Sequence, residues 1–141
     1  MSLTIEKVDV WAGEIQDRAG GLADKLQPLA AGGTDLSFLI ARRQTDKPGT
    51  GIVYLGGIKG AKQTKAALLA GLIKTGDIGC LRITAPNKPG IASEIIGRIS
   101  AAGINLRGAS ASAVGKQCVI LLSFDSPVDR DNAGKAIKRK K

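Results

Sequence analysis

Two short stretches of the sequence carry groups suited to binding a small polar molecule. One is a turn that precedes a helical pattern, and the other follows the glycine that ends this pattern. Free N–H groups at a helix start suit a carboxylate, and asparagine amides both donate and accept hydrogen bonds. Such groups could hold a small polar ligand. They lie at Asn87, at Gly90 to Ala92 and at Asn105.

The same residues also have a purely structural interpretation. Asn87 is a typical turn or N-cap residue, Pro89 is common in the first turn of a helix, and Asn105 could simply begin a strand. Residue types alone therefore leave both interpretations open.

The composition argues against catalysis. Histidine is absent, which removes the commonest general base and a frequent metal ligand. A serine or cysteine nucleophile would therefore lack its usual partner. We expect no catalytic residue, no metal site and no cofactor.

An enzyme with a nucleotide or phosphate site is a further hypothesis, and the glycine patterns do not support it. Gly49 and Gly51 begin such a pattern, but Tyr54 occupies the place of the third glycine of a dinucleotide fingerprint. Neither Gly115-Lys116 nor Gly134-Lys135 is followed by the serine or threonine of a P-loop.

The formal net charge of +9 raises nucleic-acid binding as the alternative function. Part of the excess is a basic end formed by Lys135, Lys138, Arg139, Lys140 and Lys141. Such an end also suits a solvated helix C-terminus. The run Gly57-Ile58-Lys59-Gly60 matches the GxxG of KH domains, but it follows a strand pattern and does not join two helices. Aromatic residues make up 3% of the chain, which leaves few stacking surfaces.

The expected location is the cytoplasm. No run approaches the ~18 apolar residues of a membrane span, and the N-terminal residues do not resemble a signal peptide. Cys80 and Cys118 lie within apolar runs, which predicts buried, reduced thiols.

The chain contains an internal repeat. Residues 17–36 align without a gap with residues 87–106, so that the turn, the apolar spacing and the terminal glycine coincide. We therefore predict two units, residues 1–75 and 76–141. The matched positions of the first unit form a possible second site: Asp17, Arg18, Gly20, Gly21, Leu22 and Asp35.

Each unit shows the order strand, helix, strand, strand, helix. The leading strands are predicted at 8–15 and 78–85, and the second helices at 61–73 and 129–139. Pro28 lies within the first helical pattern, so we expect that helix to be kinked or short. The second strand of each hairpin is nearly all apolar and should be central. This order predicts an α+β fold with helices on one face of each antiparallel sheet, as in ferredoxin-like units.

The fourth strand of each unit is not evident in the sequence. Between Ile73 and Pro86 there is room for one strand and not two, so the strand that leads the second unit could extend from the first sheet into the second. A complete unit has a fourth strand after its second helix, and the sequence ends soon after that helix. The N-terminal segment is long enough to pair in two places, so it or a partner chain could supply the missing edge.

The run from 78 to 124 resembles the start of an ACT domain. The resemblance rests on the turn Asn87-Lys88-Pro89-Gly90, the amphipathic helix after it, and Gly103-Ile104-Asn105 before the next strand. It is weaker over residues 8–58, where Ala19 replaces the proline. It implies a stand-alone tandem ACT protein that binds an amino acid or similar ligand where ACT units meet. The ligand-binding residues that the resemblance implies are Asn87, Lys88, Pro89, Gly90, Ile91, Ala92, Asn105 and Leu106. The resemblance also implies a possible partner enzyme and a regulatory role without catalysis. Exposed strand edges and the missing fourth strand favour a homodimer.

Overall fold

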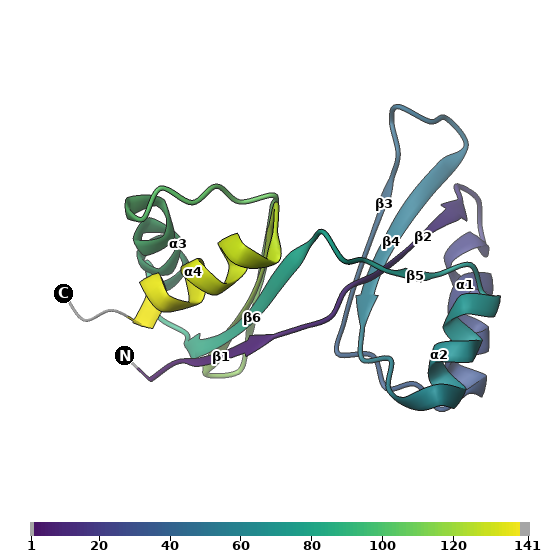
Figure 1. Ribbon diagram of the computed structural model, residues 1–141, viewed down its shortest axis with the longest axis horizontal. Helices are drawn as coiled ribbons and strands as arrows, with labels where there is room; N and C mark the ends of the chain where they lie inside the picture. The colour runs from purple at the N-terminus through teal and green to yellow at the C-terminus, as the bar shows by residue number, and fades with distance from the viewer. Residues whose placement is uncertain (1, 139–141) are drawn as a thin grey trace. The chain divides into compact units, whose positions relative to one another are not determined.

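The computed structural model describes residues 2–138 and contains two compact units. The first unit is Asp9–Thr75, and the second unit combines residues 2–8 with residues 76–138. Each unit has one antiparallel sheet of four strands, and two helices cover one face of it (Figure 1). The predicted α+β fold of two ferredoxin-like units is therefore confirmed. Among the described residues, no helix has the length and apolar character needed to cross a membrane.

The sheet of the first unit has the strand order β3-β4-β2-β5. Its core lies between this sheet and the two helices and contains Trp11, Leu29, Val53, Leu55 and Leu72. Alternate residues of β4 are fully buried because β4 is a central strand with one face toward the helices. The elements are β2 (Trp11–Gln16), α1 (Gly21–Ala31), β3 (Phe38–Arg43), β4 (Thr50–Gly56), α2 (Gly60–Leu69) and β5 (Ile73–Lys74).

The second unit repeats this plan with the strand order β1-β6-β8-β7. Its central strand β8 buries Cys118, Ile120, Leu122 and Phe124 against the helices, as the apolar sequence of that strand predicts. Both cysteines are free and buried. The elements are β1 (Thr4–Lys7), β6 (Gly79–Pro86), α3 (Ile91–Ala101), β7 (Gly108–Val114), β8 (Gln117–Phe124) and α4 (Pro127–Lys138).

The N-terminal strand β1 completes the second unit. It pairs antiparallel with β6, from Thr4 opposite Thr84 to Lys7 opposite Leu81. Leu3 and Ile5 pack against the core of this unit. Residues 2–8 therefore fold with the second unit. The boundaries predicted from the sequence, 1–75 and 76–141, had assigned them to the first unit. The physical reason is that the edge of β6 needs a partner, while the first unit already has β5 as its fourth strand.

Several element boundaries differ from the sequence expectation. The predicted strand 8–15 begins at Trp11, because the Val8 N–H donates to the Cys80 carbonyl in the second unit. The helix predicted to reach residue 73 ends at Leu69, because Gly71 adopts a φ of 82° and Ile73 joins the sheet. The predicted end of the last helix, Arg139, lies outside the described residues.

Pro28 does not shorten its helix. α1 and its counterpart α3 each have 11 residues. Pro28 lies near the C-terminal end of α1, where the loss of one N–H donor affects a single intrahelical hydrogen bond. Of the two expected alternatives, a kinked or a short helix, the short helix was therefore wrong.

A cation from the first helix of each unit caps the end of the second helix. Lys25 Nζ donates to the Ala70 carbonyl at 2.7 Å, and Arg98 Nη1 donates to the Ile137 carbonyl at 2.7 Å. Helix C-terminal carbonyls lack intrahelical partners and carry partial negative charge, so both contacts stabilise the helix pair. Arg98 also forms the predicted i,i+4 ion pair with Glu94, at 3.2 Å.

Candidate functional site

The Asn87 turn connects the end of β6 to the start of α3. The Asn87 N–H donates to the Lys116 carbonyl at 2.9 Å, and the Ile91 N–H donates to the Lys88 carbonyl at 3.2 Å. The N-cap residue is Gly90, whose φ of 81° is in the left-handed region, and no side chain caps the helix. Asn87 is therefore not the N-cap that the structural interpretation suggested. Pro89 precedes the helix, which begins at Ile91.

The candidate residues divide into exposed groups and core groups. Asn87, Lys88, Pro89, Gly90 and Asn105 are exposed. Three other candidates are apolar residues of the core: Ile91 is buried, and Ala92 and Leu106 are half-buried and pack against the same core. These three can offer backbone groups to a ligand, while their side chains hold the helix and the following strand in place.

The two asparagines lie at opposite ends of their sheet. The end of β6 at Pro86 is opposite Gln117, next to the β7–β8 turn, and Asn87 is bonded there. Asn105 instead precedes Gly108, which pairs with Ser123 at the other end of β8. The structure therefore does not bring Asn87 and Asn105 together within one unit. Neither side-chain amide has a hydrogen-bond partner among residues 2–138.

The matched turn of the first unit is closed by ion pairs. Arg43 Nε lies 2.6 Å from Asp17 Oδ2, and Arg18 Nη2 lies 2.9 Å from Asp24 Oδ2. Arg18 Nε also donates to Gln16 Oε1 at 2.7 Å. The Asp17 carboxylate thus already has a cationic partner, so it is poorly suited to hold a ligand ammonium.

The remaining first-unit candidates shape the turn and the far end of the sheet. Gly20 is the N-cap of α1 with a φ of 87°, Gly21 is buried, and Leu22 packs against the core. Asp35 is exposed and lies near Gly57, at the opposite end of the sheet from Asp17. The two units therefore place their matched residues in the same way.

A hollow of about 220 Å³ lies beside the first-unit turn. Its charged lining comprises Arg18, Arg42, Arg43 and Asp17, and Ile15 and Leu22 contribute apolar surface. Arg42 and Arg43 were not among the candidate residues predicted from the sequence. The sequence feature that could have identified them is the pair of adjacent arginines at the end of β3. Their place beside the hollow, however, depends on the register of the hairpin.

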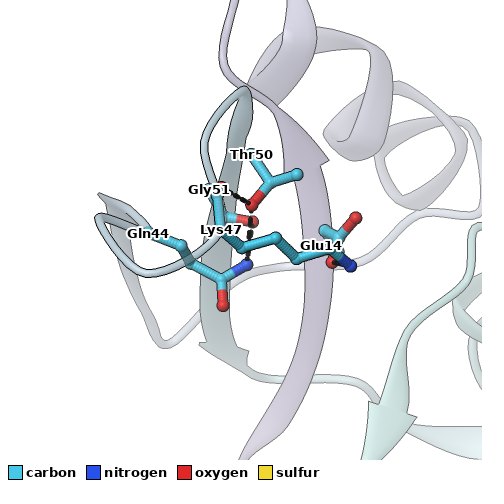
Figure 2. A network of polar contacts seen from close by, with 5 residues as sticks. All are labelled: Glu14, Gln44, Lys47, Thr50 and Gly51. Atoms are coloured by element: carbon cyan, nitrogen blue, oxygen red, sulfur yellow. Dashed lines mark hydrogen bonds and ion pairs between the residues drawn. The ribbon is translucent and has the colours of Figure 1, made fainter.

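A polar network fixes that hairpin. Figure 2 shows Gln44 Nε2 donating to Thr50 Oγ1 at 3.2 Å and to the Gly51 carbonyl at 3.3 Å. Lys47 Nζ reaches across to Glu14 Oε2 of β2 at 2.7 Å. These contacts connect the loop after β3 to β4 and β2, so they help to hold the end of β3 beside the turn.

Cys80 is a poor nucleophile in this fold. Burial raises the pKa of the Cys80 thiol to about 12, against the opposing effect of the nearby Arg130. The thiol therefore stays protonated at neutral pH, and the thiolate is the reactive form.

Comparisons with known proteins agree with this architecture. The ACT domain family model matches residues 81–141, and no curated protein matches the sequence. Protein BT0572 from Bacteroides thetaiotaomicron aligns at a TM-score of 0.77 and 19% identity, covering 95% of this chain and 88% of that chain. The ligand-free regulatory subunit of aspartate kinase from Thermus thermophilus aligns at a TM-score of 0.67 and 14% identity, covering 97% and 95%.

A longer enzyme contains the same fold as a part. Escherichia coli aspartokinase III, in complex with aspartate and ADP, aligns at a TM-score of 0.58 and 13% identity, covering 96% of this chain and 31% of that chain. At these identities the structural similarity shows the fold.

The family match covers most of the second unit, so this unit is similar to an ACT domain. The chain as a whole has the fold of two ferredoxin-like ACT units in tandem.

Proposed function

We propose that this protein is a regulatory protein that binds a small molecule, most simply an amino acid, and has no catalytic activity. The proposal is supported mainly by the exposed amides of Asn87 and Asn105, which flank α3 at its two ends and have no hydrogen-bond partner among residues 2–138. The proposed second-unit site consists of Asn87, Lys88, Pro89, Gly90, Ile91, Ala92, Asn105 and Leu106. The side chains of Ile91, Ala92 and Leu106 pack in the core, so these three residues act through their backbone.

Because the two amides lie at opposite ends of one sheet, a single unit cannot place both around one small ligand. Two ACT units that pair can do so, when the turn of one meets the start of the second hairpin strand of the other. We therefore propose that the ligand binds where two ACT units meet.

A homodimer is the proposed assembly. β7 is an edge strand whose residues from Ala109 to Val114 are exposed within this chain, and edge strands offer free N–H and C=O groups to a second strand. The proposed partner is an enzyme whose activity the ligand controls. The free, buried cysteines support a reducing compartment such as the cytoplasm.

Isothermal titration of the folded protein against the twenty amino acids tests the function. We expect one amino acid to bind, and no binding across the set would refute the amino-acid version. Asn87→Ala and Asn105→Ala should each weaken the binding by about tenfold, since each removes a hydrogen bond to a charged ligand group.

Asn132→Ala is the matched control, because Asn132 is an exposed asparagine of the same unit outside the proposed site. It should leave the affinity unchanged. Weakening by Asn87→Ala alone would restrict the site to one turn and would contradict the paired-unit arrangement. Light scattering measures the oligomeric state. A monomer at the protein concentration of the titration would contradict the proposed homodimer.

A further inference from the structure

The outer face of α2 combines lysines with leucines. Lys62, Lys65, Leu68 and Leu69 are all exposed, and their spacing of three or four residues places them on one side of the helix. Ala67, on the opposite side of α2, is fully buried in the core of the first unit. The lysines and leucines therefore share the side of α2 that is open to solvent.

The two leucines occupy positions at which a surface helix normally carries polar residues. Leu68 and Leu69 are 57% and 80% exposed. Each of the other three helices instead buries a leucine or an isoleucine: Leu29 in α1, Ile95 in α3 and Ile137 in α4.

Core packing does not explain the leucines of α2. The helix packs through small residues, since Ala67 lies in the core and Ala66 lies near α1. A Cβ on Gly32, which follows α1, would lie 3.4 Å from the Ala66 Cβ, so the two helices already approach closely. A leucine on the inner side of α2 would be too large for this space.

Exposed apolar side chains gather around the end of α2. Six large hydrophobic side chains are exposed among residues 2–138, and three of them are Leu68, Leu69 and Ile73. Leu69 is the most exposed of the six. Single exposed hydrophobic residues are common on protein surfaces, whereas a group of them marks an interaction surface.

The charge of this surface has a single sign. Lys59, which is the N-cap residue, Lys62 and Lys65 are exposed, and their side chains have no ion-pair or hydrogen-bond partner within residues 2–138. No acidic residue occurs in α2. Charge complementarity therefore requires a negatively charged partner, and the same face of a second copy would be repelled.

The residue types favour a lipid surface over a protein surface. Protein interfaces are depleted in lysine and enriched in arginine and aromatic residues, and α2 has neither of the enriched types. Helices that lie on membranes combine lysine with leucine. The aliphatic side chains enter the boundary between headgroups and acyl chains, while the lysine ammonium groups are attracted to anionic headgroups.

We propose that the outer face of α2 docks on an anionic lipid surface. Leu68 and Leu69 enter the headgroup layer, and Lys59, Lys62 and Lys65 contact the anionic headgroups. Both components are needed, because a small apolar contact alone gives only marginal membrane binding.

Co-sedimentation of the full chain with lipid vesicles tests the proposal. One vesicle contains equal parts of phosphatidylcholine and phosphatidylserine, and the other contains phosphatidylcholine alone. We expect binding to the first, at least about tenfold weaker binding to the second, and weakening of the first as sodium chloride is added. Equal binding to both vesicles, or no binding to the anionic vesicle at low salt, would overturn the proposal. Binding to duplex DNA without binding to the anionic vesicle would assign the lysines to nucleic acid and would also overturn it.

Leu69→Gln should weaken binding to the anionic vesicle by about tenfold, because the contact loses an apolar side chain. Leu69 is largely exposed, so the variant should fold like the wild type, which circular dichroism checks. Val128→Gln is the matched control, because Val128 is a 67% exposed apolar residue of α4 in the second unit. Unchanged binding by Leu69→Gln, or equal weakening by both variants, would contradict the assignment to α2.

Lys65→Gln tests the contribution of charge and should weaken the same binding by about fivefold. Lys116→Gln is its control, because it removes one exposed positive charge from the turn between β7 and β8. The control should bind nearly like the wild type. Equal weakening by the two variants would indicate a general attraction of the basic chain to anionic lipid and would overturn the proposed surface.

Discussion

At the residue scale, two glycines at helical positions have opposite roles. Gly21 begins α1, and a Cβ there would collide with the Gln16 carbonyl oxygen of the preceding strand. Gly97 lies on the exposed side of α3, where a Cβ would have no atom within 4 Å. The first glycine permits a close backbone approach, while the second only lowers helix propensity.

Gly21→Ala should therefore destabilise the protein by at least about 2 kcal/mol, because the strand and the helix must move apart. Gly97→Ala, its matched control, should stabilise the protein by roughly 0.5–1 kcal/mol. Chemical denaturation gives both changes as shifts of the transition midpoint. An unchanged transition midpoint in Gly21→Ala would contradict this prediction, because it would show that the turn accommodates the Cβ without loss of stability.

The candidate site could be predicted in part at this scale. The turn at Asn87 and the glycine that ends α3 are local features, because a turn and a cap are determined by a few adjacent residues. Arg43 could not be predicted, because it reaches the turn at Asp17 through the pairing of three strands. The separation of Asn87 and Asn105 likewise depends on the length and direction of the paired strands.

At the element scale, β1 is held in the second unit by its pairing with β6 and by a contact to α4. Lys7 Nζ lies 3.0 Å from Asp131 Oδ1. The hydrogen bonds from Lys7 and Arg130 lower the pKa of Asp131 from its usual value of 3.8. A carboxyl group with a lowered pKa in the folded state contributes stability above its unfolded pKa and loses it as the pH falls through the folded value.

Asp131→Asn should therefore lower the free energy of unfolding at about pH 7, and the difference from the wild type should shrink as the pH falls through the lowered pKa of the folded state. Urea denaturation at several pH values measures this difference. Asp125→Asn, which changes an exposed carboxylate of the same unit, is the control. A difference that persists at low pH would show that the effect does not arise from the charge.

The elements themselves were largely predictable, and their pairing was less so. The repeat fixed the order of strands and helices, because apolar spacing and turn residues are local signals. The sequence left the fourth strand of the second unit open between the N-terminal segment and a partner chain. The two-residue strand β5 was also missed, because so short a strand has no periodicity of its own.

At the scale of the whole molecule, the two units differ in how the chain builds them. The first unit is continuous, and its ends meet, since the Thr75 N–H donates to the Val10 carbonyl at 2.9 Å. The second unit is discontinuous and needs β1 from the far end of the sequence.

A polypeptide of residues 9–75 should therefore unfold cooperatively by itself. Residues 76–141 alone should be markedly less stable, because β6 would expose an edge and the core would lose Leu3 and Ile5. A peptide of residues 1–8 should raise the melting temperature of this fragment. Circular dichroism melts follow all three. A fragment of residues 76–141 that melts like the full chain would contradict the role of β1.

The position of β1 also sets an order of events during protein synthesis. β1 leaves the ribosome before any part of the first unit, but its partner β6 follows only after the first unit is complete. The first unit, which is continuous, can fold as it emerges. The sheet of the second unit can be completed only when β1 pairs with β6. The second unit therefore completes its fold last, and β1 remains unpaired while the first unit is synthesised.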